Sequence, residues 1–295
     1  MLIDCHQHLW PEQLVEALRR RSTYPYLREW TLYLAGEPPY EVDPHAHDVE
    51  RRRQREIAEG KELVILSISS PLGMEYLDSA ELLDVWHESG LALDDPYRIW
   101  ASAHVAQPDP SALAKILSED RVVGVQLPAT ALGDPAGIER MGPLLEEAER
   151  ANKPVLVHPG PAPACDPGVP SWWPAMVPYV AQMHGAWLAW HVAGRRQHPR
   201  LRIAFAALAG LAPLHHERLA ARGGALGPLD PYVYYETSSY GTRAIDALTR
   251  VVGVDPLVHG SDRPYAEPVD PGLGDAFRHA LFTANPRHLL TGQPR

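Results

Sequence analysis

Two histidines separated by a single residue, His6 and His8, lie near the start of the sequence. They come at the end of an apolar, β-rich run over residues 2–8, and successive side chains of a strand point to opposite faces. Both imidazoles are therefore expected on one face, where their nitrogens can bind the same metal ion. A lone His-x-His pair is weak evidence for a metal site, but at the end of a strand that opens a parallel barrel it is a strong indication.

Two further candidate ligands follow later apolar runs. His158 ends the run over residues 154–158, and Asp262 comes just after the run over residues 256–260. Taken singly, His158 is typical of a satisfied core histidine, and Asp262 of a turn or a helix cap. The carboxyl ends of barrel strands gather at one mouth, however, so all four side chains are expected to meet there. The prediction is one divalent ion with an open position for water, and with Asp262 as the catalytic group that accepts the proton of that water.

A second His-x-His pair, His45 and His47, provides a comparison within the same chain. Asp43 and Pro44 precede it and a charged run follows, which is typical of the entry into a helix. Since no strand is predicted to carry these histidines, we expect neither of them to bind metal and their replacement by alanine to leave metal content unchanged.

The elements that must position these residues are eight apolar, β-rich runs that alternate with stretches of helical spacing. The runs cover residues 2–8, 62–69, 98–105, 122–127, 154–158, 201–207, 232–238 and 256–260. Eight such strands close a (β/α)₈ TIM barrel, and we expect residues 1–295 to form one domain of this α/β class. The irregular stretch from Ser22 to Asp48 is expected to be an insertion after the first strand, and Pro159 to Pro174 a second long loop near the active site.

The composition, with 45% hydrophobic and 22% charged residues, is that of a globular protein. The formal net charge of −10 disfavours binding to nucleic acid and to anionic membranes. Two cysteines, Cys5 and Cys165, make no disulfide framework and suit a reducing compartment. Since the sequence contains neither a signal-peptide pattern nor an apolar run of membrane-spanning length, a cytoplasmic protein is expected.

Six segments spread over nearly the whole chain carry recognisable motifs. They are His6–His8, Gly124–Leu127, Lys153–Pro159, Glu236–Gly241, Gly260–Tyr265 and Asn285–Leu290. Together they resemble the amidohydrolase superfamily, in particular the amidohydrolase-related branch that includes aminocarboxymuconate-semialdehyde decarboxylase. The resemblance implies a barrel enzyme with one Zn²⁺ or similar divalent ion, held by the four residues already selected.

One position departs from the pattern of that branch. Where its members usually have a histidine at the end of the sixth strand, which serves as proton donor or base in the decarboxylases, this chain has Ala207. His104, His215 and His216 are the candidate substitutes, although an exposed or helix-terminal place is favoured for each. We therefore expect a metal-dependent hydrolase of an amide, ester or lactone. The first alternative is a metal-dependent decarboxylase of an aromatic or enoic carboxylic acid, and the second is a catalytically inactive ligand-binding barrel.

The expected partner is a small molecule that is carboxylated or aromatic. Trp10 and Trp172 are candidates for aromatic walls of its pocket. Arg263, adjacent to Asp262, is expected to pair with a substrate carboxylate, and Gln126 to hydrogen-bond the substrate. The sequence leaves the oligomeric state open, with a homodimer as one option.

Overall fold

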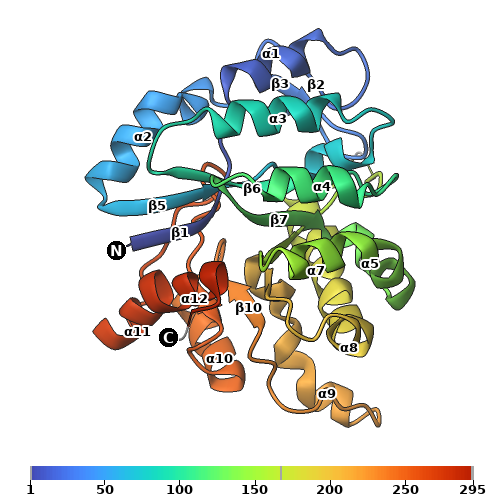
Figure 1. Cartoon of the computed structure of the whole chain (residues 1–295), viewed down its shortest axis with the longest axis vertical. Coiled ribbons are helices and arrows are strands. Elements are labelled where there is room, and N and C mark those ends of the chain that lie inside the picture. The colour runs from blue at the N-terminus through green and yellow to red at the C-terminus, as the bar shows by residue number, and fades with distance from the viewer. Residues whose placement is uncertain (1, 167, 294–295) are drawn as a thin grey trace.

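The computed structural model describes residues 2–166 and 168–293, and its centre is a sheet of eight parallel strands (Figure 1). The strands are β1 (Leu2–Gln7), β5 (Lys61–Leu66), β6 (Tyr97–Ser102), β7 (Val122–Pro128), β8 (Val155–His158), β9 (Ile203–Phe205), β10 (Val233–Glu236) and β11 (Leu257–Val258). They pair in the order of the chain, from β1 with β5 to β10 with β11. This order and the parallel direction confirm the (β/α)₈ prediction.

Backbone hydrogen bonds between the first strand and the segment after the last strand bring the sheet close to a closed barrel. Cys5 N donates to His259 O at 2.9 Å, and Asp262 N donates to His6 O at 2.9 Å. His8 N donates to Arg263 O at 2.6 Å. Closure of the barrel therefore places Asp262 beside the histidines of the first strand, although Asp262 and His6 are 256 residues apart in the sequence.

Helices surround the strands on the outside of the barrel (Figure 1). The longer helices are α1 (Glu12–Arg20), α2 (Val49–Ala58), α3 (Glu81–Leu91), α4 (Pro110–Leu117), α5 (Pro135–Arg150), α7 (Pro178–Ala189) and α10 (Thr242–Val252), and the shorter ones are α6 (Trp173–Met176), α8 (Arg195–Gln197), α9 (His216–Ala220), α11 (Asp275–His279) and α12 (Asn285–Thr291). Asp109 and Asp134 cap α4 and α5, and a proline follows each cap at the first helical position. Within the described ranges, no helix combines the length and the apolar character needed to cross a bilayer.

The strands are continuous apolar runs in the sequence because both of their faces are buried. Val64, Ile65 and Leu66 of β5 each have 0% of their surface exposed. The predicted runs over residues 98–105 and 201–207 extend past the ends of β6 and β9. Apolar residues that continue beyond a strand line its loop and cannot be separated from the strand by composition alone.

The insertion after β1 is more ordered than the irregular stretch that its sequence predicts. Three short strands, β2 (Tyr26–Arg28), β3 (Thr31–Tyr33) and β4 (Tyr40–Glu41), form an antiparallel sheet within it. Strands of two or three residues are too short to show the alternation by which a strand is recognised in a sequence. This small sheet supplies part of the wall of the cavity described below.

The second His-x-His pair lies at a helix entry, as predicted. Pro44–His47 form a single 3₁₀ turn directly before α2, and the Asp43 side chain accepts from His45 N at 2.9 Å. His47 is buried, and its ring stacks on Trp10 at a centroid distance of 4.4 Å. Replacing His47 would therefore remove core packing, so the exposed His45 is the neutral control of the pair.

Candidate metal centre and its cavity

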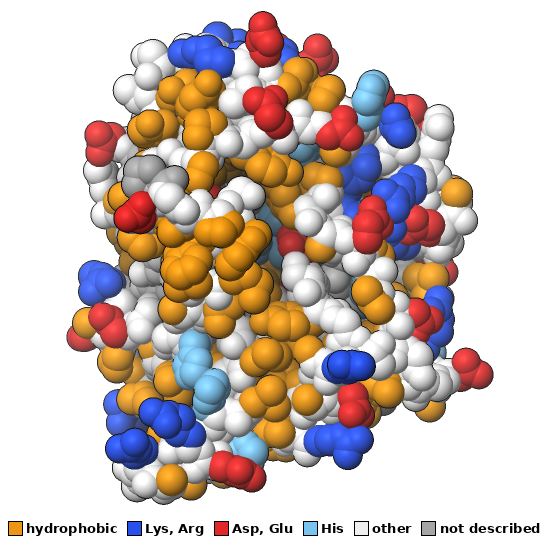
Figure 2. Space-filling view, turned by 180° about the vertical axis from the view of Figure 1, so that it is seen from behind, with side chains coloured by type: hydrophobic (Ala, Val, Ile, Leu, Met, Phe, Trp, Pro, Cys, Tyr) orange, Lys and Arg blue, Asp and Glu red, His pale blue; other side chains and the backbone are white. Residues whose placement is uncertain are grey.

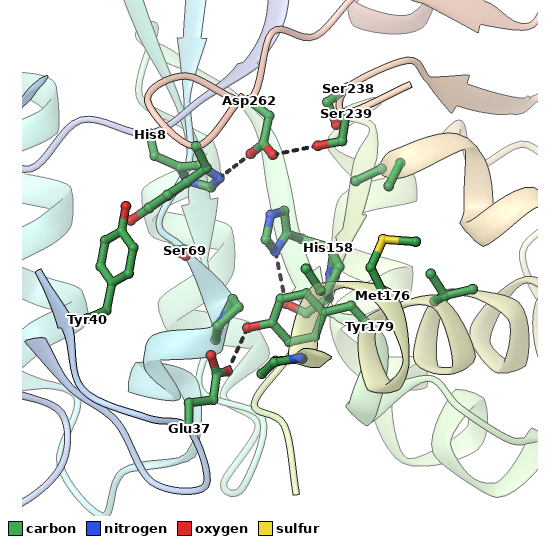
Figure 3. Close-up of a pocket in the computed structure, with 18 of the residues that line it drawn as sticks. His8, Glu37, Tyr40, Ser69, His158, Met176, Tyr179, Ser238, Ser239 and Asp262 are labelled. Atoms are coloured by element: carbon green, nitrogen blue, oxygen red, sulfur yellow. Dashed lines mark hydrogen bonds and ion pairs between the residues drawn. The ribbon is translucent and has the colours of Figure 1, made fainter. Parts of the chain in front are cut away.

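Four side chains from three strand ends converge at the carboxyl-terminal mouth of the barrel (Figure 3). His6 and His8 lie at the end of β1, His158 ends β8, and Asp262 follows β11. One ligand atom of each lies within 4.8 Å of the others. His8 Nε2 is 3.1 Å from His6 Nε2 and 3.1 Å from Asp262 Oδ1. The structure thus brings together all four residues that were predicted from the sequence as metal ligands.

Each of the three histidines is held through its other ring nitrogen. The Nδ1 contacts are His6 with Glu236 Oε2 at 3.2 Å, His8 with Ser67 O at 3.0 Å and His158 with Pro159 O at 2.9 Å. Because an ionised carboxylate and a carbonyl can only accept, the Nδ1 atoms carry the hydrogens and the Nε2 lone pairs are free. The Nε2 lone pairs of His6 and His8 face each other at 3.1 Å and repel unless a cation lies between them. This donor set therefore fits a divalent metal ion.

The pKa shifts of His8, His158 and Asp262 also fit a metal site. Burial lowers the pKa of His158 far below its usual value, and it also lowers the pKa of His8. Burial acts in the same direction on His6, but the contact with Glu236 raises the pKa of that ring overall. For Asp262, burial opposes ionisation, whereas the adjacent His8 ring and the neighbouring His6 and His158 rings lower the pKa to about 2. Neutral imidazoles and an ionised carboxylate are the forms that bind divalent ions.

Glu236 is a residue of this site to which the sequence motifs assigned no role. It ends β10, is fully buried, and accepts from Ser238 N at 2.5 Å and from Ser238 Oγ at 2.7 Å in addition to its contact with His6. A Cβ at Gly260 would lie 2.2 Å from Glu236 Oε1, so only glycine leaves room for this carboxylate. Its position at a strand end, which it shares with His158 and Asp262, is the sequence feature that could have indicated a role at this site.

Asp262 is held from two sides. Its Oδ2 accepts from Ser239 Oγ at 3.2 Å, while Oδ1 faces His8 Nε2. Its backbone has a φ of 59°, a left-handed conformation that aspartate and asparagine tolerate better than most residues. The side chain is 17% exposed, whereas those of His6 and His8 are at most 1% exposed, so the carboxylate is the more accessible side of the cluster.

A cavity of about 420 Å³ opens over the cluster and extends to the insertion after β1. Most of its walls are apolar, with contributions from Leu32, Leu34, Leu72, Met176, Val180 and Met183. Figure 2 shows hydrophobic side chains around the hollow in the middle of this face, with histidine and acidic side chains visible inside it. Among the described residues that line the cavity, none is a lysine or an arginine. Its volume and apolar character suit a small molecule.

Ala207 lies in the wall of this cavity, where the family resemblance implies a histidine. It begins a run of five residues with positive φ, from 48° at Ala207 to 63° at Leu211. This left-handed conformation costs about 1–2 kcal/mol for each residue that has a Cβ. The run is packed tightly, since a Cβ at Gly210 would lie 2.7 Å from Val180 O. A strained turn thus presents to the cavity a methyl group that cannot transfer a proton.

The three histidines considered as substitutes do not line the cavity. His104 follows β6, where its Nδ1 accepts from Gln107 N at 2.9 Å and its Nε2 contacts Leu77 O. His215 and His216 line a separate cavity of about 270 Å³ next to α7 and α9. None of these three rings is therefore placed at the cavity to take the role that the family resemblance gives to the missing histidine.

Two of the predicted substrate contacts, Trp10 and Arg263, lie away from the cavity lining. Trp10 is 1% exposed and packs in the core against His47. The Arg263 guanidinium forms ion pairs with Glu59 at 2.7 Å and with Glu267 at 3.1 Å. Because its charge is already paired within the chain, Arg263 stabilises the segment after β11 and is not available for a substrate carboxylate.

Trp172 lies on the loop that follows β8, directly before α6. It is 55% exposed. Its neighbours Ser171 and Pro174 line the cavity, but Trp172 itself does not. Contact between Trp172 and a substrate therefore stays a prediction.

Gln126 belongs to a buried polar cluster at the ends of β5, β6 and β7. Its Nε2 donates to Ile68 O at 2.9 Å and to Ser70 Oγ at 2.7 Å, which holds the loop after β5 rather than a substrate. Ser70 Oγ also donates to the fully buried Glu75 carboxyl group. Gln126 Oε1 and Glu75 Oε2 have no hydrogen-bond partner. A protonated Glu75 would supply the missing donor for such an acceptor.

We expect Glu75 to make stability depend on pH. Burial raises its pKa from the usual 4.5 to about 7, although hydrogen bonds, first among them that of Ser70, act in the other direction. The unfolded chain releases this proton near pH 4.5 and the folded chain only near pH 7, so the free energy of unfolding should fall by about 3 kcal/mol between these values. Urea unfolding at pH 5 and pH 7.5 should show a smaller fall for Glu75→Gln than for the wild type. Equal falls in the two proteins would contradict this assignment.

No family model and no curated protein sequence matches the chain. Solved structures do match over nearly the full length. Metarhizium anisopliae IDCase in its apo form has a TM-score of 0.81 at 18% identity, covering 98% of this chain and 97% of that one. An amidohydrolase II has a TM-score of 0.75 at 18% identity, covering 99% and 100%.

A third structure is 5-carboxyvanillate decarboxylase from Novosphingobium aromaticivorans complexed with manganese and 4-hydroxy-3-methoxy-5-nitrobenzoic acid. It has a TM-score of 0.70 at 16% identity, covering 98% of this chain and 96% of that one. At these identities the likeness concerns the fold. The resemblance implied by the motifs is confirmed at that level: the chain has the barrel fold of amidohydrolase-family enzymes.

Proposed function

We propose that this protein is a metal-dependent decarboxylase of a small aromatic or enoic carboxylic acid. The observation that carries the proposal is the cavity: the four-residue cluster opens onto largely apolar walls, and Asp262 is the carboxylate that adjoins it. Loss of carbon dioxide moves the negative charge of the carboxylate onto the substrate carbon, where a proton then neutralises it, and removal of water from the carboxylate favours such a step. The structural neighbours, several of which are aromatic-acid decarboxylases, support this choice over hydrolysis.

His6, His8, His158 and Asp262 would hold the metal. When bound, a divalent ion supplies positive charge that attracts the substrate carboxylate and stabilises negative charge on the reacting molecule. Manganese, which a neighbour binds, and zinc, which three nitrogen donors favour, are both compatible with this set. The Nδ1 contacts of the three histidines with Glu236, Ser67 O and Pro159 O would keep their Nε2 atoms turned toward the ion.

The residues of the chain then have distinct tasks. The apolar walls hold the body of the substrate and exclude water from its carboxylate. Once the carbon–carbon bond breaks, the electron pair stays on the substrate carbon and carbon dioxide leaves. Asp262, which is ionised at rest, would take up one proton from solvent or from the bound acid and donate it to that carbon, which returns Asp262 to its ionised form. Ser239, which donates to Asp262 Oδ2, would orient the carboxyl group for this transfer.

A metal-dependent hydrolase is the second candidate, and Ala207 is the observation that favours it. Hydrolysis needs a group that accepts a proton from water and returns it to the leaving group, and Asp262 can do both. It does not need the histidine that the related decarboxylases use and that this chain lacks. The two candidates therefore share the metal and Asp262, and they differ in whether carbon dioxide is released.

The test is a substrate panel with the manganese-loaded and the zinc-loaded protein. The panel contains hydroxybenzoic and enoic acids, together with matched esters, amides and lactones. We expect release of carbon dioxide from at least one acid, loss of that activity with a chelator, and recovery when the metal is restored. Hydrolysis of a panel member without carbon dioxide release would favour the hydrolase, and binding without any turnover would favour an inactive barrel.

A further inference from the structure

A second carboxylate, Glu37, lines the same cavity on the side of the insertion after β1. Its Oε1 accepts from Tyr179 Oη, which belongs to α7, at 2.6 Å. Figure 3 shows this pair across the cavity from Asp262 and Ser239, with His158 between them in the view. The cavity therefore has an acidic group near each end, one at the metal cluster and one near the insertion.

The backbone fixes the place of Glu37. Gly36 has a φ of 89°, and a Cβ there would lie 2.5 Å from Ala162 O in the loop after β8. Cys165 N, in the same loop, donates to Gly36 O at 3.3 Å. The close approach of these two segments requires glycine, and it sets the adjacent Glu37 in the wall of the cavity. Glu37 is thus half-buried in the cavity wall and hydrogen-bonded to α7.

The electrostatic surroundings leave Glu37 without a compensating charge. None of the described residues that line the cavity is a lysine or an arginine. Burial raises the pKa of Glu37, and the Tyr179 hydroxyl opposes this by donating to the carboxylate. One phenolic donor satisfies only part of a carboxylate that can accept about four hydrogen bonds. A ligand that supplies a donor or a positive charge would complete its coordination.

Aromatic rings accompany this carboxylate. Tyr40, Tyr179 and Tyr265 all line the cavity, and the rings of Tyr40 and Tyr265 are 6.3 Å apart. Aromatic faces attract organic cations, and a neighbouring carboxylate strengthens that attraction. A substrate with a second carboxylate would meet Glu37 instead, and the lining offers it no cation. The same features thus favour a positive charge at this end of the substrate and disfavour a negative one.

We propose that Glu37 is a specificity-determining residue, which selects acids that carry an ammonium group or another nitrogen donor far from the reacting carboxylate and rejects dicarboxylic acids. This inference rests on the proposed function, because it assumes that the reacting carboxylate lies at the metal cluster. In this proposal, the insertion after β1 recognises the end of the substrate that is distant from the reacting carboxylate.

The experiment measures binding by calorimetry to the manganese-loaded protein. The probes are benzoate, terephthalate, 4-(aminomethyl)benzoate and its longer aminoethyl homologue. The last two sample two distances between the carboxylate and the ammonium group. We expect the better of the two ammonium acids to bind at least about tenfold more tightly than terephthalate, which is the effect of one hydrogen bond to a charged group. All of this binding should disappear in the chelated protein.

The variants assign the preference to a residue. Glu37→Gln should remove the difference between the ammonium acids and terephthalate. Glu41→Gln, which changes an exposed glutamate in β4 of the same insertion, should leave the difference intact. A preference that survives in Glu37→Gln, or that is lost in Glu41→Gln, would overturn the assignment to Glu37.

The ranking in the wild type tests the inference without any variant. If benzoate binds in a metal-dependent manner but the ammonium acids show no advantage over terephthalate, the inference is wrong and the proposed function stands. If no acid binds in a metal-dependent manner, the proposed function itself fails.

Discussion

Replacing both His6 and His8 with alanine is expected to abolish divalent metal binding. The wild type should hold close to one metal ion per chain, because the Nε2 atoms of the two rings lie 3.1 Å apart, and Asp262 Oδ1 lies 3.8 Å from that of His6 and 3.1 Å from that of His8. Removal of both leaves one nitrogen and one carboxylate, fewer than the three protein ligands of a typical catalytic site. Metal content per chain, measured after removal of loosely bound ions, is the readout.

His45→Ala is the matched control for that experiment. His45 belongs to the other His-x-His pair, is exposed, and lies in a 3₁₀ turn outside the barrel. Its replacement should leave metal content unchanged. A double variant of His6 and His8 that still holds one equivalent of metal would show that the ion lies elsewhere, and a loss of metal in His45→Ala would contradict the placement of the site.

The second large effect is expected for Asp262→Asn. Asparagine has nearly the same size, tolerates the left-handed backbone at this position and can still accept from Ser239. It cannot hold an acidic proton, so turnover should fall by about 10²–10⁴-fold, the usual contribution of a general acid–base group. The measurement is kcat at saturating metal, with the metal content of the same sample determined in parallel.

Ser239→Ala is the companion variant, since it removes the hydroxyl that donates to Asp262 and keeps the carboxylate. We expect a smaller loss of turnover than for Asp262→Asn. If Asp262→Asn retains wild-type turnover at full metal occupancy, Asp262 is not the proton-transfer group.

The sequence allowed the barrel and the metal cluster to be predicted because both follow from local patterns. Buried strands leave continuous apolar runs, and the parallel arrangement sends the end of every run to one mouth. His158 and Asp262 could therefore be placed beside His6 before any contact was known. The same reasoning separated the His45 pair from the His6 pair, because only one of them follows a strand.

The walls of the cavity could not be predicted in this way. Arg263 follows Asp262 in the sequence, but its guanidinium pairs with Glu59, a residue whose position depends on how α2 packs. Trp10 follows His6 and His8 in the sequence, but it packs in the core against His47. Glu37 and Tyr179 meet only because a long insertion folds over the barrel mouth. The periodicity of the sequence does not predict that contact.

The most direct test of the proposed function is the isotopic content of the product formed in D₂¹⁸O. The reaction uses the metal-loaded protein and whichever panel member is turned over. Decarboxylation by Asp262 predicts carbon dioxide, one solvent deuterium on the carbon that carried the carboxylate, and no ¹⁸O in the organic product. An organic product that contains ¹⁸O, formed without carbon dioxide, would contradict the account and identify a hydrolase.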